Sequence, residues 1–114
     1  MLPQLEVLLR ASAKIVSFQI LNNDPLDETH FLFTIRCELT SGHTLQIRIR
    51  SVAGMLRYSY QEFTDKPYQR WDNAPHFPRL STFPHHHHDS QGNIIESPLT
   101  GDPIRDLPVV LNEL

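Results

Sequence analysis

Hydrophobic and polar residues alternate along the middle of the chain, which is the pattern of half-buried β-strands. Between residues 31 and 39 every odd position is apolar, and most even positions are polar. Residues 45–50 repeat this alternation, and their polar face carries Gln46, Arg48 and Arg50. Ser41-Gly42 separates the two runs with residues typical of a hairpin turn. The pattern therefore predicts paired strands that bury one face and expose an arginine-bearing face.

Other segments are also rich in β-branched and aromatic residues, or continue the alternation. We predict strands over residues 15–21 and 55–63, a further strand beginning at 68–71, and a short edge strand at 94–95. Turn-forming residues separate these segments at 22–25, 65–67 and 89–93. Successive short strands divided by turns indicate an antiparallel meander.

The two ends of the chain have helical periodicity. Residues 2–10 place leucines on one face, with Pro3 in a first-turn position. Near the end, apolar residues recur at helical spacing from Leu107 to Leu114, and we expect this helix to start near Asp106 because Pro108 suits only a first turn. The predicted fold class is α+β. We expect one domain over residues 1–114, a curved antiparallel β-meander with short N- and C-terminal helices on one face.

Composition narrows the class of protein. The 114 residues contain a single cysteine, Cys37, which excludes an internal disulfide and a multi-cysteine zinc site. No apolar run approaches the ~18 residues that a membrane span needs, so a cytoplasmic protein without membrane contact is predicted. The net charge is −3, but residues 36–79 carry seven basic and four acidic side chains. A polyanion could therefore bind at the centre of the chain.

Histidines are concentrated in residues 70–89, which contain five of the seven. If residues 85–88 are extended, His86 and His88 share one face, while His85 and His87 share the other. Two interpretations of the pair at 86 and 88 stay open besides catalysis. The pair could bind a metal, completed by His76 or Asp89, or it could be a structural cluster.

Metal-free RNA cleavage requires a base that deprotonates the 2′-hydroxyl, an acid for the leaving 5′-oxygen, and a cation for the phosphorane. Imidazoles suit the two proton transfers, because histidine titrates near neutral pH. The candidates for these transfers are His76, His86 and His88, and an arginine can hold the phosphate. The candidate arginines are Arg48, Arg50, Arg57 and Arg70.

Several neighbours of the histidines have simpler structural interpretations. Trp71 and Cys37 are expected in the core. Tyr58 and Tyr60 are expected to pack on the sheet, with one of their two hydroxyls near the site. Asp72 and Asn73 are expected to build a turn through side-chain to backbone hydrogen bonds. Alternatively, Asp72 could orient a neighbouring imidazole.

Arg70-Trp71-Asp72-Asn73-Ala74-Pro75-His76, followed by Thr82-Phe83-Pro84 and His85 to His88, resembles the signature of the TumE-like family of toxin–antitoxin toxins. The resemblance covers nearly the whole chain. It implies a small cytoplasmic toxin with ribonuclease activity, encoded beside a helix-turn-helix antitoxin. The positions that match the motif are Arg70, Asp72, His76, His85, His86 and His88. Phe77 departs from the second histidine that many members carry beside His76, so the working base could lie in the later run.

Together these observations predict a metal-independent endoribonuclease toxin with no metal and no other cofactor. The residues expected to be catalytic are Arg70, His76, His86 and His88, with Asp72 as an orienting residue. The residues expected to bind substrate are Arg48, Arg50, Arg57 and His85. The expected partners are RNA, a helix-turn-helix antitoxin protein and, through an exposed sheet edge, a second copy in a homodimer. The alternatives are a non-catalytic protein-interaction module and a metal-binding protein.

Overall fold

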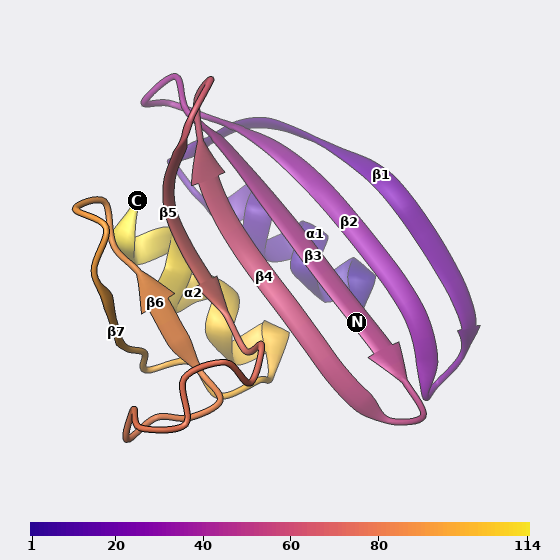
Figure 1. The fold of residues 1–114 in the computed structure, drawn as a ribbon. Helices are drawn as coiled ribbons and strands as arrows, with labels where there is room; N and C mark the ends of the chain where they lie inside the picture. Colours follow the sequence, from indigo (N-terminus) through magenta and orange to yellow (C-terminus); the bar gives the residue numbers. More distant parts are fainter.

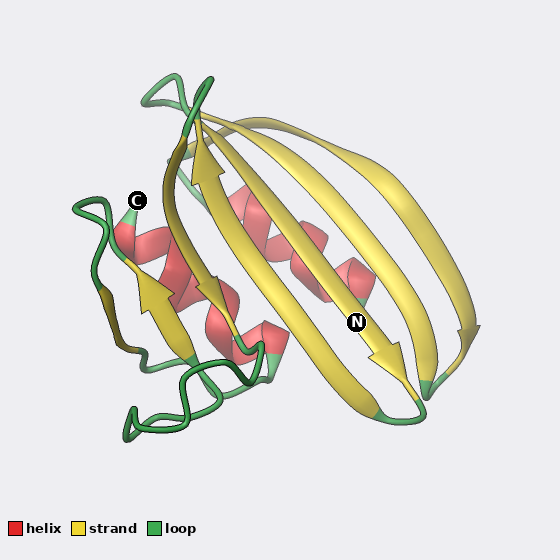
Figure 2. Cartoon of the chain, viewed as in Figure 1, coloured by secondary structure: helices red, strands yellow, loops and turns green.

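Seven antiparallel β-strands follow one another in chain order across a single curved sheet (Figure 1). This architecture comes from a computed structural model that describes residues 1–114. The strands are β1 (Ile15–Asp27), β2 (His30–Leu39), β3 (Thr44–Val52), β4 (Met55–Phe63), β5 (Pro67–Asp72), β6 (His86–His88) and β7 (Ile94–Glu96). Helices α1 (Leu2–Ala11) and α2 (Pro103–Glu113) lie on the same side of this sheet (Figure 2). The predicted α+β meander with terminal helices is confirmed.

The helices cover the face of the sheet that the alternation predicted to be apolar. This inner face contributes alternate residues of β2 and β3, among them Ile35, Cys37 and Ile47, and all three are buried. The two helices add their own apolar stripes: Leu2, Leu5, Leu9, Leu107, Val110 and Leu111. Each such side chain contributes ~1.5–3 kcal/mol when it leaves water, so this contact holds the layers together. The opposite, outer face has no helix over it.

Strand β1 is longer than predicted. Residues 22–25, expected to form a turn, continue the strand to Asp27, and the turn follows at Glu28-Thr29. There the Asp27 carboxylate accepts hydrogen bonds from the amide (2.8 Å) and hydroxyl (2.9 Å) of Thr29. Pro25 fits in the strand because β1 is an edge strand with a free side. The pairing of β1 with β2 shifts register at three places, and such bulges limit pairing between edges, so the homodimer stays a prediction.

Helix α2 begins at Pro103, not near Asp106 as predicted. Two carboxylates explain the early start. Asp102 caps the helix by accepting from the amide of Ile104 (3.1 Å). The buried Asp106 accepts from the amide and hydroxyl of Thr100 and from the amide of Gly101, which fixes the chain just before the helix. With its first turn held in this way, the helix accommodates Pro108 in its interior.

The histidine-rich segment joins the same sheet. Strand β5 pairs with β6, and β6 pairs with the short edge strand β7, as predicted for residues 94–95. The intervening residues 73–85 form a loop on the rim of the sheet (Figure 2). Asn73 fixes its start, since its side chain accepts from the amide of Tyr58 (3.0 Å) and donates to the carbonyl of Leu56 (2.9 Å). Neither helix has the length and apolarity that crossing a membrane requires.

Asp106→Asn should destabilise the fold by about 2 kcal/mol or more, because an amide replaces one of two buried carboxylate oxygens that together accept three hydrogen bonds. Urea unfolding followed by circular dichroism measures this change. The matched control is Asp102→Asn, where asparagine caps a helix about as well as aspartate. Equal midpoints for the two variants would show that Asp106 has no special structural role.

Candidate functional site

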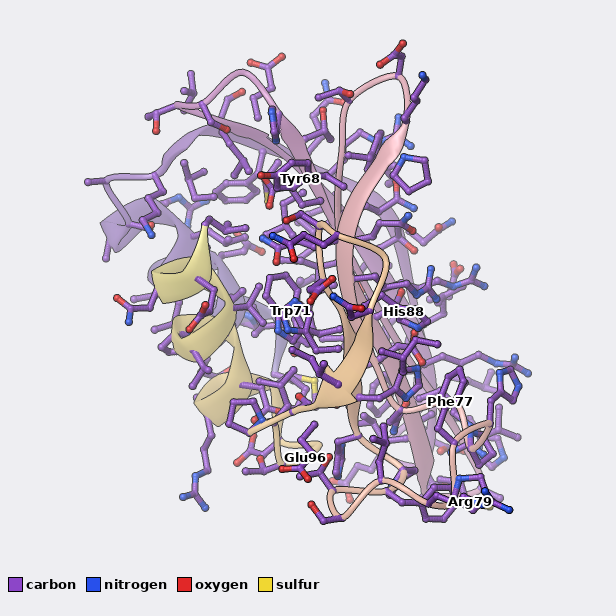
Figure 3. The ribbon with its side chains drawn as sticks, turned by 60° about the vertical axis from the view of Figure 1, so that its left-hand side comes forward. Tyr68, Trp71, Phe77, Arg79, His88 and Glu96 are labelled. Carbon is purple, nitrogen blue, oxygen red and sulfur yellow. The ribbon has the colours of Figure 1, made fainter.

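Asp72, His86 and His88 form a cluster on the outer face, where β5 meets β6. The ladder pairs Asp72 with His86 and Arg70 with His88. Because successive side chains of a strand point to opposite faces, these four side chains share one side of the sheet. Figure 3 shows His88 on this side, while Trp71 points toward α2. The expectation that His86 and His88 share a face is confirmed.

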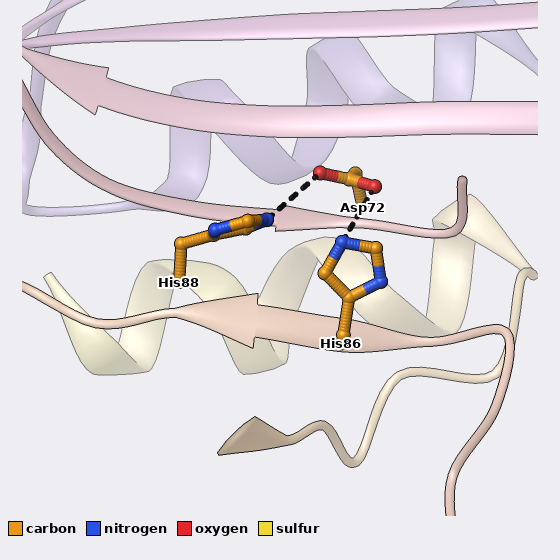
Figure 4. A group of neighbouring side chains, drawn as sticks. All are labelled: Asp72, His86 and His88. Atoms are coloured by element: carbon orange, nitrogen blue, oxygen red, sulfur yellow. Dashed lines mark ion pairs between the residues drawn. The ribbon is translucent and has the colours of Figure 1, made fainter. Parts of the chain in front are cut away.

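The Asp72 carboxylate is the centre of the cluster (Figure 4). Its Oδ1 lies 3.0 Å from Nε2 of His86 and accepts from the amide of Ala74 at 2.9 Å. Its Oδ2 accepts from Nε of Arg70 at 2.8 Å and lies 3.7 Å from Nε2 of His88. The expected side-chain to backbone hydrogen bond of Asp72 is present, and the same carboxylate contacts the His86 imidazole.

His86 is the most buried member of the cluster, with 2% of its side chain exposed. Its Nδ1 lies 3.1 Å from the carbonyl oxygen of Pro84, which can only accept a hydrogen bond, so Nδ1 is the donor in this contact. Its Nε2 lies 3.0 Å from Oδ1 of Asp72. The imidazole is therefore held between a backbone carbonyl and the Asp72 carboxylate.

His88 is the member of the cluster that solvent reaches, with 36% of its side chain exposed. Partial burial lowers the pKa of His88, and the nearby positive charges of His86 and Arg70 act in the same direction, while the Asp72 carboxylate opposes them. A lowered pKa keeps the imidazole neutral near pH 7. His88 can therefore accept a proton from a bound molecule.

The other two histidines of the run point to the inner side. His87 stacks on Trp71, with ring centroids 4.4 Å apart and planes 9° apart, and its Nε2 donates to Oε1 of Gln69 (3.0 Å). Nδ1 of His85 lies 2.8 Å from the hydroxyl oxygen of Tyr58, within hydrogen-bond distance, and burial raises the pKa of that hydroxyl and keeps it protonated. The Tyr58 hydroxyl therefore reaches His85, and the structure does not bring His85 into the cluster.

His76 also lies outside the cluster, exposed on the loop that follows β5. The adjacent Phe77 takes the place beside the imidazoles. Its ring lies edge-on, with centroids 4.8 Å from His86 and 5.9 Å from His88. Sequence reasoning noticed Phe77 only as a departure from the motif and did not predict this contact. Its position directly after His76 in the signature was the available signal.

Arginines line a groove that runs from the cluster along the outer face. A cavity of about 270 Å³ is bounded by Arg50, Arg57, Asp72 and other polar residues. A second cavity, of about 390 Å³, continues it and shares Arg48, Ser59 and Arg70 with the first. The structure therefore places all four predicted phosphate-binding arginines on one surface beside Asp72. Two further groove residues, Ser59 and Gln61, were not predicted.

The cluster also has the donor set of a metal site. One ligand atom from each of Asp72, His86 and His88 lies within 4.8 Å of the others. Two imidazoles and a carboxylate suit zinc and other transition metals. Against this, Nε of Arg70 already donates to Oδ2 of Asp72 at 2.8 Å. A metal bound at this oxygen must displace the guanidinium.

Comparison with known protein families agrees with the resemblance seen in the sequence. A family model described as Toxin TumE matches residues 5–114, essentially the whole chain. The chain belongs to the TumE toxin family. This confirms the resemblance drawn from the signature, and a toxin family suggests an antitoxin as partner. No curated protein and no solved structure matches the chain.

Asp72→Asn should destabilise this TumE-family chain by ~1–3 kcal/mol, because a neutral amide replaces the nearly buried carboxylate that accepts from Arg70 and Ala74. Urea unfolding followed by circular dichroism measures this change. The matched control is Asp65→Asn, an exposed residue outside the cluster, which should leave the free energy of unfolding unchanged. Equal free energies of unfolding for Asp72→Asn and the parent chain would contradict a structural role of this carboxylate.

Proposed function

We propose that this TumE-family toxin is a metal-independent endoribonuclease, and that His88 is the base that deprotonates the attacking 2′-hydroxyl. The observation that carries the proposal is a half-buried imidazole with a lowered pKa whose ladder partner, Arg70, lines the arginine-rich groove. A positioned base contributes ~10²–10⁴ in rate. The positive groove supplies the attraction for the phosphodiester chain.

In the proposed reaction, the 2′-oxygen loses its proton to His88 and bonds to phosphorus, while the bond from phosphorus to the 5′-oxygen breaks. The 5′-oxygen takes a proton, and the products are a 2′,3′-cyclic phosphate and a 5′-hydroxyl. We assign the role of the acid that protonates the 5′-oxygen to His76. It is an exposed imidazole on the loop that carries Phe77 to the cluster. His86 is too buried to touch RNA, so we assign it the role of holding Asp72 in place.

Arg70 is suited to bind the phosphate that gains charge. A guanidinium has five N–H donors. Two of them are held in place, one by Oδ2 of Asp72 (2.8 Å) and one by Oε1 of Gln61 (2.9 Å). Three remain for a phosphate in the groove. Because the side chain is fixed before substrate arrives, its charge is preorganised for the transition state.

His88→Ala should lower RNA cleavage ~10²–10⁴-fold, the usual contribution of a general base. Cleavage of a defined RNA in the presence of EDTA measures this, with the cyclic phosphate identified by mass spectrometry. The matched control is His30→Ala, an imidazole at the start of β2 that pairs with Asp27 (3.1 Å) outside the cluster. Equal loss in both variants, or full activity in His88→Ala, would refute the assignment.

The acid limb of the pH profile of kcat/KM should lie below 6.5, the ordinary value for histidine, because the pKa of His88 is lowered and the neutral form is the base. Activity should rise with pH through this limb. His88→Ala should abolish the limb along with most of the rate. A limb above 6.5 would mean that another group accepts the proton.

A metal-binding protein is the second candidate, and the ligand atoms of Asp72, His86 and His88 favour it. It predicts that tag-free protein retains stoichiometric zinc after dialysis and that EDTA abolishes cleavage.

A non-catalytic interaction module is the third candidate, and a growth assay distinguishes it from an enzyme. If His88→Ala inhibits growth as strongly as the parent chain, toxicity comes from binding a partner.

A further inference from the structure

Arg50 and Arg57 face each other across the β3–β4 pair, at the end of the groove that lies away from Arg70. They are direct cross-strand partners, and both are exposed. Neither forms an ion pair with a carboxylate, since the ion pairs of arginine in this chain are Arg10–Glu6 and Arg70–Asp72. Like charges directly opposite each other destabilise a sheet. No carboxylate pairs with either guanidinium, so both are available to bind an anion.

Register gives the distance of this pair from the reacting centre. Ser59, two residues beyond Arg57, is the ladder partner of Asp72, and Gln61 is the partner of Arg70. Two residues along a strand span ~7 Å. The arginine pair is therefore one row from Asp72 and two rows from Arg70. At this separation along the strands the pair faces a phosphate next to the one at Arg70, and it lines the same cavity.

We propose that Arg50 and Arg57 bind a phosphate next to the scissile one, so that the substrate is a single strand running from the cluster toward the β3–β4 turn. This inference rests on the proposed function and deepens it. The two guanidiniums offer paired donors to one phosphate. The opposite end of the groove is weaker, because Lys66 is accompanied there by Asp65. A single strand is required because attack in line with the leaving oxygen needs a backbone freed from A-form stacking, and protein contacts to RNA bases and backbone are made most readily in single strands.

The test measures binding separately from cleavage. The probe is RNA with 2′-O-methyl groups at every position, which cannot be cleaved, used as a dinucleotide and as a longer strand. Arg50→Gln/Arg57→Gln should weaken binding of the longer strand at least tenfold and leave the dinucleotide unchanged. The salt dependence of log K should become shallower by about 0.7 for each phosphate that the variant no longer neutralises. Removing the repulsion should let this variant fold at least as well as the parent chain.

The matched control is Arg36→Gln/Arg105→Gln, which has the same net charge. Arg36 is held by Gln46 and lies outside both cavities, and Arg105 is on α2. The proposal is overturned if the control weakens binding equally, if a duplex of the same length binds as tightly as the strand, or if the parent chain does not bind the strand. Normal binding without cleavage of unmodified RNA would refute the proposed ribonuclease and leave this subsite standing.

Discussion

The short antiparallel pairing of β5 with β6 is the constraint on which the site depends. The adjacent residues His86, His87 and His88 are chemically equivalent until this ladder assigns each to a side of the sheet. A slip of one residue would turn His87 into the groove and His86 and His88 toward the core. The stack of His87 on Trp71, with its hydrogen bond to Gln69, fits only the observed register. One histidine thus fixes the placement of its two neighbours.

Charge compensation around Asp72 explains how a buried carboxylate is tolerated there. Removing a charge from water is costly unless partners replace the lost hydration. Asp72 accepts hydrogen bonds from an amide and a guanidinium and lies beside the imidazole of His86, and both side chains are also fixed by a second group. Arg70 is held by Gln61, and His86 by the carbonyl of Pro84. The result is a rigid base for the more exposed His88.

The fold could be predicted from the sequence, and so could the face of the sheet on which each site residue of a strand lies, because both follow from local periodicity. The arginines of β3 and the alternation of His85 to His88 were placed correctly on this basis. Contacts that depend on the path of residues 73–85 could not be predicted. The pairing of β5 with β6, the edge-on contact of Phe77 and the isolation of His76 all depend on that loop. Its start is fixed by bonds from Asn73 to β4, which no local pattern indicates.

The two errors in element boundaries have the same origin. Turn residues at 22–25 and Pro108 were given their usual local meaning, but tertiary partners outweighed propensity. Pairing with β2 extends β1 through Pro25, and the buried carboxylate of Asp106 stabilises a helix start ahead of Pro108. In both places polar side chains fix chain ends at positions that hydrophobic periodicity does not indicate.

Whether the cluster uses a proton or a metal is decided by competition between cations. The ligand geometry of Asp72, His86 and His88 suits either. A divalent ion would have to release Arg70 from Oδ2, and it would then face the arginines of the groove. Both effects oppose binding of a positive ion, and neither opposes binding of a phosphate. The electrostatics of the outer face therefore favour binding of an anion over binding of a metal ion.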